Sequence, residues 1–253
     1  MKLHTILPLI FIAALMLTAC IPATTVPIGT TSFHRSDKAE RRTLVVFLPG
    51  RGDSVKSYEN EGFVQMLSSG NGAVDALGVE AHLGYYRDRS LLKRLREDVL
   101  IPAKKEGYSD IWLVGISLGG LGAILYDSTY PGELAGVIVM APYLGEGTLL
   151  AEISRAGGLT AWRPAVVVDG NQEQEIWLKL KEYAGGSMMG AGRVFLGFGE
   201  SDRFAPTNRY FSANLASRQT VIVPGGHDWP TWQDLWPRLL EISPLARVQG
   251  ENR

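Results

Sequence analysis

Ser117 stands between two glycines, in Gly115-Ile116-Ser117-Leu118-Gly119, and this spacing is typical of a serine that serves as a nucleophile. The apolar run at 111–114 directly before it predicts a buried strand, and residues 120–126 after it predict a helix. A tight turn between such a strand and helix pushes the hydroxyl out over the end of a sheet, where it can attack an acyl carbonyl. The helix N-terminus behind it points backbone N–H groups at the negative charge that develops. The motif therefore predicts a serine hydrolase.

The elements that must position this serine alternate between strands and helices, which predicts a parallel sheet with right-handed crossovers. Unbroken apolar runs predict buried strands, whereas apolar residues at helical spacing predict helices. We expect strands at 43–48, 74–82, 111–114, 136–141, 194–198 and 220–223. We expect helices from Asp53 or Ser54 to about Ser69, and at 90–100, 120–126, 172–184 and 229–242.

This order of elements resembles the α/β-hydrolase fold from about Thr43 to the end of the chain. The resemblance implies an α/β domain with a mostly parallel sheet, helices on both faces, and a small insertion before the strand that carries the catalytic acid. In that family the nucleophile, the acid and the histidine follow one another in the chain, each on a loop at the carboxyl end of a strand. The resemblance implies no cofactor, and no closely spaced ligand set suggests a metal site.

The family's chain order singles out one histidine and one favoured acid. His227 is the only histidine after Ser117, and it lies between the last expected strand and the last expected helix, where the family has its general base. Asp202 follows the strand at 194–198, where the family has its acid. Glu200 is the nearest competitor, and Glu146 is another because some members take the acid from the preceding strand. Trp229, next to His227, fits either a buried helix face or the pocket.

The family's oxyanion hole consists of two backbone N–H groups. Leu118, directly after the nucleophile, is expected to supply the first. The second is expected from Leu48-Pro49-Gly50-Arg51-Gly52, which resembles the family's His-Gly-x segment with proline in place of histidine. Arg51 is the favoured donor, and Gly52 remains the alternative.

Residues 143–192 form an insertion that a minimal connection between two strands does not need. The helix expected at 172–184 carries Ile176, Trp177, Leu180 and Tyr183 on one face. In the family, insertions here form a cap over the pocket. A surface helix that packs on the sheet explains the same pattern equally well.

The N-terminus has the features of a secretory signal. Lys2 provides a positive charge, and the apolar run at 6–17 is short for crossing a bilayer. Its end, Leu17-Thr18-Ala19-Cys20, resembles the lipobox of bacterial lipoproteins, in which the cysteine is acylated and becomes the first mature residue. Cys20 is also the only cysteine in the chain, so it has no internal disulfide partner. A plain cleaved signal peptide is the alternative.

The expected organisation is a signal peptide at 1–19, a tether at 20–38 rich in Thr, Pro and Gly, and a catalytic domain at 39–253. Ile21 occupies the place where an aspartate would retain a lipoprotein in the inner membrane, so we expect attachment through Cys20 to the outer membrane, facing the periplasm. The near-neutral net charge of −1 argues against a nucleic-acid partner.

The expected activity is hydrolysis of small carboxylic esters or thioesters through an acyl-enzyme on Ser117. A peptidase or an acyltransferase of the same fold is the first alternative, because both share the acyl-enzyme step. A catalytically silent, anchored binding module is the alternative from another class. The sequence leaves the acyl chain length, the leaving group and the oligomeric state open.

Overall fold

The computed structural model describes residues 22–34, 42–68, 74–185 and 193–245. Seven strands form one sheet in the order β1-β3-β2-β4-β5-β6-β7, and all neighbouring strands are parallel except β1 and β3. The strands are β1 (Thr30–His34), β2 (Arg42–Leu48), β3 (Val74–Val79), β4 (Tyr108–Ile116), β5 (Gly136–Met140), β6 (Val194–Gly199) and β7 (Thr220–Val223).

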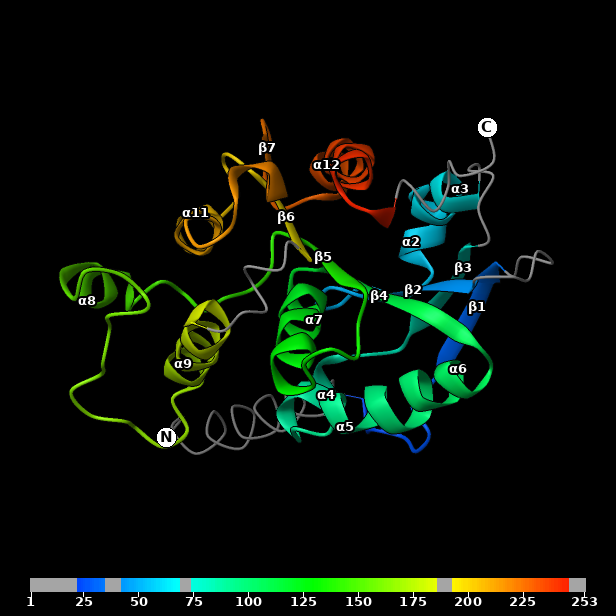
Figure 1. Ribbon diagram of the computed structural model, residues 1–253, viewed down its shortest axis with the longest axis horizontal. Coiled ribbons are helices and arrows are strands. Elements are labelled where there is room, and N and C mark those ends of the chain that lie inside the picture. Colours follow the sequence, from blue (N-terminus) through cyan, green and yellow to red (C-terminus); the bar gives the residue numbers. More distant parts are fainter. Residues whose placement is uncertain (1–21, 35–41, 69–73, 186–192, 246–253) are drawn as a thin grey trace, which may run out of the picture.

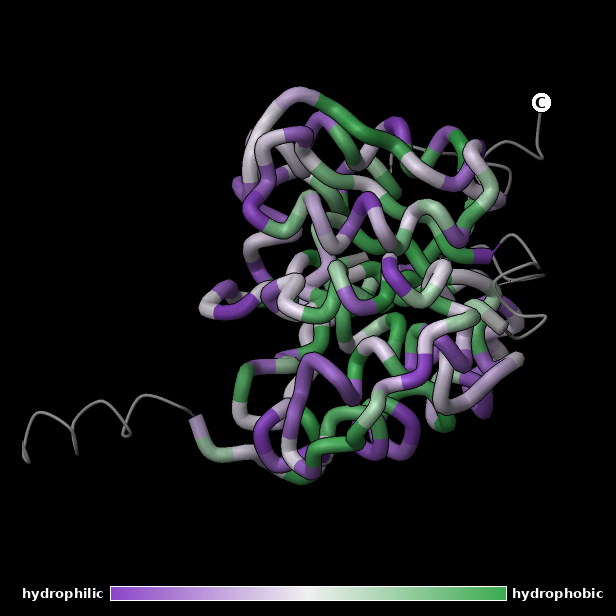
Figure 2. The backbone as a smooth tube through the Cα atoms, turned by 90° about the vertical axis from the view of Figure 1, so that its left-hand side faces the viewer, coloured by the Kyte–Doolittle hydropathy of each residue, from purple (hydrophilic) through white to green (hydrophobic). Residues whose placement is uncertain are grey.

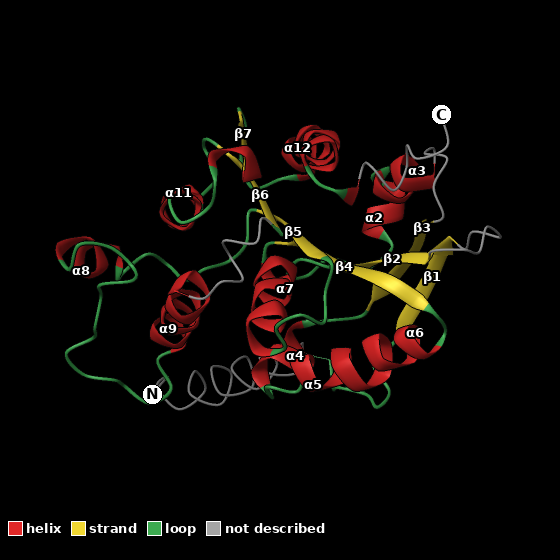
Figure 3. Cartoon of the chain, in the orientation of Figure 1, coloured by secondary structure: helices red, strands yellow, loops and turns green. Residues whose placement is uncertain are grey.

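Helices cover both faces of this sheet (Figure 1, Figure 3). One face carries α2 (Ser57–Asn60), α3 (Phe63–Ser68) and α12 (Trp229–Ile242). The other carries α4 (Leu83–Arg87), α5 (Leu91–Arg94), the π-helical turn η1 (Leu95–Leu100), α6 (Ile101–Lys105), α7 (Leu118–Thr129) and α9 (Gln172–Gly185). At the β6–β7 end lie α8 (Leu150–Arg155), α11 (Ala205–Ser212) and the short 3₁₀ turn η2 (Ser217–Gln219). The predicted α/β fold with helices on both faces is confirmed.

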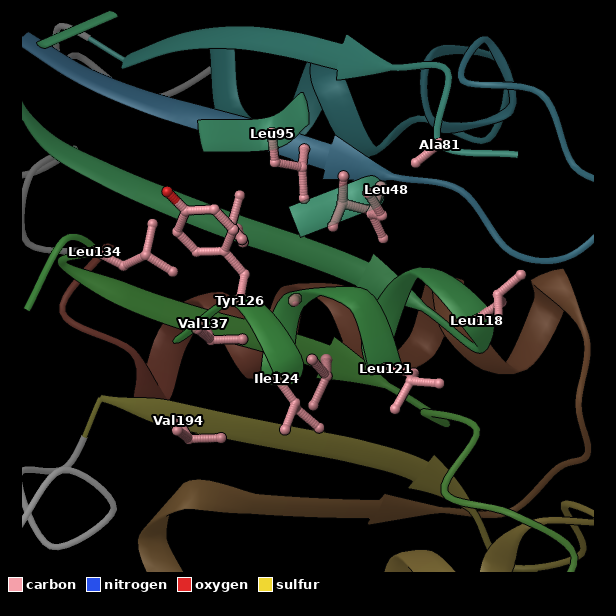
Figure 4. Packing of buried hydrophobic residues seen from close by; sticks show 14 of the residues in the cluster. Leu48, Ala81, Leu95, Leu118, Leu121, Ile124, Tyr126, Leu134, Val137 and Val194 are labelled. Carbon is pink, nitrogen blue, oxygen red and sulfur yellow. The ribbon is translucent and has the colours of Figure 1, made fainter. Parts of the chain in front are cut away.

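The strands are apolar on both faces because both faces are covered. In β2, Val46 and Leu48 pack under α7, whereas Val45 and Phe47 pack under α3 and α12. Figure 2 shows hydrophobic segments running through the middle of the molecule. Figure 4 shows α7 lying over the strands, with Leu118 at the end nearest the strand arrowheads. The N-terminus of α7 thus lies at the carboxyl edge of the sheet.

Three differences between the expected and the observed elements have a local cause. The helix expected from Asp53 or Ser54 to Ser69 is two short helices, because Gly62 turns the chain with a φ of 84° between them. The strand expected at 74–82 ends at Val79, and His82 instead caps α4 by accepting a hydrogen bond from Gly84 N–H. The helix expected at 90–100 continues to Lys105, with the wider π-helical turn directly before Pro102, which has no N–H to donate.

The segment expected as a tether at 20–38 is partly folded against the domain. Its residues 30–34 form β1, which pairs with β3, and Ile28 is only 3% exposed in the main core. Residues 22–34 show too little apolar periodicity to reveal this strand, because β1 is an edge strand that pairs with β3 alone. The signal peptide at 1–19, Cys20 and residues 35–38 of the predicted tether lie outside the described residues.

Candidate active site

Ser117 occupies a strained turn between β4 and α7. Its φ of 52° and ψ of −114° are unusual for a residue with a side chain, and such backbone strain persists only where surrounding bonds impose it. Here Ser117 N–H donates to Met140 O at 2.9 Å, while Ser117 O accepts from Tyr143 N–H at 3.0 Å and Leu121 N–H at 3.1 Å. The turn is thus held by β5 and by the first turn of α7.

The two glycines of the motif allow two main-chain segments to approach closely. A Cβ on Gly115 would lie 2.3 Å from the Gly119 carbonyl carbon and oxygen, and a Cβ on Gly119 would lie 2.0 Å from Leu48 O. The start of α7 therefore crosses β4 directly and packs against the loop that follows β2. This contact brings Leu118 next to the segment that contains Arg51.

Ser117, His227 and Asp202 form one chain of hydrogen bonds. His227 Nε2 lies 3.0 Å from Ser117 Oγ, and His227 Nδ1 lies 2.8 Å from Asp202 Oδ2. A carboxylate only accepts hydrogen bonds, so the imidazole proton belongs on Nδ1, which leaves Nε2 free to accept the serine proton. The arrangement can generate a nucleophilic serine.

Asp202 and His227 come together because the loops after β6 and β7 are joined by main-chain bonds. Glu200 N–H donates to Val223 O at 2.8 Å, and Ser201 N–H donates to Gly225 O at 2.9 Å. The Asp202 side chain is fully buried, and its Oδ1 accepts from Phe204 N–H at 2.7 Å. Both oxygens of the Asp202 carboxylate therefore have a hydrogen-bond partner within the protein, although the side chain is shielded from water.

The competing acids have other surroundings. Glu200 and Glu146 are exposed, and the hydrogen bond that the structure gives Glu146 is with the Tyr143 side chain. The imidazole of His227 packs edge-on between Phe204 and Trp232, with both ring centroids 5.1 Å away. The geometry thus pairs His227 with Asp202 and not with either glutamate.

Leu118 and Arg51 line the same cavity as Ser117. Leu118 is the first residue of α7, so its N–H has no carbonyl partner within the helix and points out of the helix end. Gly50 lies close enough that a Cβ there would be 3.7 Å from the Ser117 Cβ. Arg51 lies on the cavity wall, whereas Gly52 is absent from its lining.

Two tyrosines that sequence reasoning missed bind the two segments predicted to form the oxyanion hole. Tyr58 Oη donates to Leu48 O at 2.7 Å, and Tyr86 Oη donates to Leu118 O at 2.9 Å. Burial raises the pKa of both hydroxyls far above the usual range, so both keep their protons at neutral pH. No local motif marks these residues, because each acts through a fold contact with a distant carbonyl.

Asp53 and Trp229 lie behind the site, not inside the cavity. Trp229 packs edge-on against Tyr58, Phe63 and Trp232, and its side chain hydrogen-bonds to Asp53. Burial raises the pKa of the Asp53 carboxyl, although the bond from Trp229 and the nearby His227 oppose this effect. Trp229 is half-buried and packs against the core outside the cavity lining, which agrees with the helix-face interpretation and not with the pocket.

The catalytic cavity has a volume of about 980 Å³ and runs away from Ser117 along α7. Leu118, Leu121 and Leu125 form one wall at helical spacing, and Ile176 and Leu178 of α9 form the facing wall. The insertion therefore contributes to the pocket. It also packs on the body, because Trp177 is fully buried and lies edge-on to Tyr210 of α11. Helix α9 of the segment 143–192 thus does both things that were expected as alternatives: it lines the pocket, and it packs on the body of the domain.

The residues that the structure describes contain no group of three or more His, Cys, Asp or Glu side chains arranged to hold a metal ion. Within the same ranges, no helix combines the length and the apolar character that crossing a bilayer requires.

Fold and site together are those of an α/β-hydrolase. A family model described as "Putative esterase" matches residues 90–241, more than half of the chain. The chain belongs to this esterase family and is a carboxylic ester hydrolase of the serine hydrolase class. No curated protein matches it in sequence.

Three solved structures with the same fold are distant from this chain in sequence. A ferulic acid esterase has a TM-score of 0.59 and 15% identity, over 86% of this chain and 97% of that one. An S-formylglutathione hydrolase from Staphylococcus aureus has a TM-score of 0.55 and 13% identity, over 91% of this chain and 99% of that one. Est1E from Butyrivibrio proteoclasticus has a TM-score of 0.52 and 18% identity, over 87% of this chain and 92% of that one.

Proposed function

We propose that the protein cleaves carboxylic esters or thioesters through an acyl-enzyme on Ser117. His227 takes the Ser117 proton as Oγ attacks the acyl carbon, and the tetrahedral intermediate carries its negative charge on the former carbonyl oxygen. The N–H groups of Leu118 and Arg51 stabilise that charge. His227 then gives its proton to the leaving alcohol or thiol as the bond to the acyl carbon breaks. In the second half, water loses a proton to His227 and attacks the acyl carbon of the acyl-enzyme. His227 then returns that proton to Ser117 Oγ as the bond between Oγ and the acyl carbon breaks, which releases the acid and restores the serine.

Asp202 holds the imidazole in the required tautomer and stabilises the imidazolium. The observation that carries the proposal is the continuous chain of bonds at 2.8 Å and 3.0 Å from Asp202 through His227 to Ser117. The apolar walls of the cavity support an acyl group with a hydrocarbon portion, placed along α7. The reaction so described needs no cofactor.

The test of this proposal is covalent labelling with a fluorophosphonate, combined with hydrolysis of p-nitrophenyl esters of increasing chain length. We expect wild type to be labelled and active, and Ser117→Ala to lose both, since removal of a serine nucleophile costs about 10⁶ in kcat in a well-studied protease. Labelling that persists in Ser117→Ala would exclude this serine as the nucleophile.

The same experiment separates the alternatives. A silent binding module would bind esters without labelling or turnover. An acyltransferase would pass the acyl group to an added alcohol in preference to water, and a peptidase would cleave amides at comparable rates.

We further propose that the mature protein is a lipoprotein acylated at Cys20 and attached to the outer membrane, facing the periplasm. Leu17-Thr18-Ala19-Cys20 and the residue Ile21 support this proposal. We expect Cys20→Ser to block acylation and to leave the precursor unprocessed, while esterase activity persists because Cys20 is remote in sequence from the triad. Metabolic labelling with an alkyne fatty acid measures this, and incorporation into Cys20→Ser would contradict it.

A further inference from the structure

An exposed run of three valines lies in the loop between α8 and α9. Val166, Val167 and Val168 are 68%, 68% and 51% exposed, although each is large and apolar. Isolated apolar side chains are common on surfaces, but a consecutive run marks a surface that meets an apolar partner. The loop is firmly held, because the buried Gln174 accepts from Val168 N–H at 2.8 Å and donates to Val166 O at 2.9 Å.

The valine run (Val166–Val168) is attached to the rim of the catalytic cavity. Gln174, which holds the loop, is flanked in α9 by Gln172 and Glu175, and both of these line the cavity. Glu175 accepts two hydrogen bonds from Arg89, at 3.0 Å and 3.2 Å. Arg89 follows α4 directly, so this ion pair joins the α9 side of the rim to the α4 side.

The N-terminal segment lies on the α4 side of the same rim. Thr25 N–H donates to Tyr85 Oη at 3.0 Å, and Thr24 Oγ1 donates to Asp88 Oδ2 at 2.8 Å. Arg87 of α4 lines both the catalytic cavity and a small hollow bordered by Pro22 and Thr24. Figure 1 shows the α8–α9 loop and the dark blue segment before β1 both along the lower edge of the molecule.

Pro22, the first described residue, borders the small hollow beside α4 together with Thr24 and Arg87. The N-terminal end of the described chain therefore lies next to the mouth of the catalytic cavity.

The charged residues around the mouth of the catalytic cavity are complementary to an anionic surface. Arg51, Arg87 and Arg203 are exposed cavity residues without an ion-pair partner in the part of the chain that the structure describes. Of the three carboxylates that line the cavity, Glu175 pairs with Arg89 and Glu182 with Lys179, so among the described lining residues only Glu146 opposes the three arginines. Arginines at such a rim attract anionic lipid headgroups.

We propose that this face docks on a lipid bilayer with anionic headgroups. The valine run enters the interface, the three arginines contact headgroups, and the mouth of the cavity opens toward the membrane. The ester substrate then passes from the bilayer into the cavity without crossing water. Docking is inferred from the surface residues alone, whereas the supply of an ester from the bilayer rests on the proposed function.

The first test measures docking without catalysis. The full chain carrying Val167→Cys is labelled with an environment-sensitive fluorophore and added to preformed phosphatidylglycerol vesicles, with Ile242→Cys as the matched control. Ile242 is also an exposed apolar residue, but it lies at the end of α12, on the other face of the sheet. Wild type is treated in parallel to measure any label that enters at Cys20.

We expect vesicles to shift the emission of the Val167→Cys label to the blue and to protect it from iodide, with neither change at Ile242→Cys. The shift should be weaker with phosphatidylcholine vesicles, which lack the net negative charge. Equal signals at the two positions would overturn the proposal. A blue shift at Val167→Cys without vesicles would also overturn it, because it would place this surface against another copy of the chain.

The second test measures the consequence for substrate supply. Val167→Asp should lower the kcat/KM for a long-chain ester held in vesicles about tenfold, because a charge opposes insertion of the loop, and should leave p-nitrophenyl acetate in water unchanged. Ile242→Asp should change neither. Equal rates of Val167→Asp and wild type on the vesicle ester would contradict docking. Wild type that is inactive on both esters, while the Val167→Cys label still shifts to the blue on vesicles, would contradict the proposed function and leave docking supported.

Discussion

The carboxylate of Asp202 is buried away from water and is compensated by only two neighbours, His227 and the N–H of Phe204. A buried charge is costly unless it is paired, so this arrangement is stable only because both oxygens are bonded. The same pairing determines the tautomer of His227 and therefore which ring nitrogen faces Ser117. In the proposed mechanism, catalysis thus depends on a residue that does not touch the substrate.

Replacing Asp202 by Asn should separate this role from folding. The amide can donate a hydrogen bond to Nδ1, which leaves the proton on Nε2 and prevents it from accepting the serine proton. We expect a loss of up to about 10⁴ in kcat for Asp202→Asn, measured with p-nitrophenyl butyrate.

Glu200→Gln and Glu146→Gln serve as matched controls, since each removes a nearby charge with little change in shape. We expect each to cost less than about tenfold, or roughly 1.4 kcal/mol of transition-state stabilisation. A crippled Glu146→Gln beside an active Asp202→Asn would assign the acid to the loop after β5.

At the scale of elements, the site depends on how closely α7 approaches the loop after β2. Gly119 makes this approach possible, because any side chain there would meet Leu48 O. The approach aligns the open N-terminus of α7 with the Gly50–Arg51 turn. Tyr58 hydrogen-bonds to the carbonyl at the end of β2, and Tyr86 hydrogen-bonds to the carbonyl of the first residue of α7, so both segments are fixed in place.

Gly119→Ala should therefore reduce activity although alanine favours helices by about 1 kcal/mol over glycine. A Cβ 2.0 Å from Leu48 O forces α7 away from the loop, and a displacement of about 1 Å between catalytic groups can cost about 10²-fold. We expect kcat/KM to fall by about that factor.

Gly29→Ala is the control, because its Cβ would meet only the flexible, exposed carboxylate of Glu80. It should retain wild-type kcat/KM. Full activity of Gly119→Ala would show that the close approach is not required.

At the scale of the whole molecule, the N-terminal segment belongs to the folded body. Ile28 fills the main core, its N–H donates to Asp98 Oδ2 at 2.9 Å, and β1 extends the sheet beyond β3. A membrane anchor ahead of this segment would be connected to the catalytic domain over a short, bound length of chain.

Ile28→Ala should lower the free energy of unfolding by about 2–5 kcal/mol, the range for removal of a large aliphatic side chain from a core. Val26→Ala, two residues earlier and 76% exposed, should stay within about 0.5 kcal/mol of wild type. Urea denaturation of both variants measures the difference. Equal midpoints for the two variants would mean that the segment contributes nothing to stability.

The sequence by itself determined the features that depend on local pattern. The strand-turn-helix around Ser117, the strand at 220–223 and the helix at 229–242 were predictable, because apolar runs, glycine spacing and caps act over a few residues. Asp228, for example, caps α12 by accepting from Thr231 N–H at 3.0 Å. The lipobox lies outside the described residues and remains a prediction.

Only the tertiary structure decided which distant groups meet. The pairing of His227 with Asp202, and not with Glu200 or Glu146, depends on how the loops after β6 and β7 join. The hydroxyls of Tyr58 and Tyr86 reach carbonyls 10 and 32 residues away in sequence. Periodicity carries no information about such contacts, because they arise from the packing of whole elements, and the folding of residues 30–34 onto β3 was hidden for the same reason.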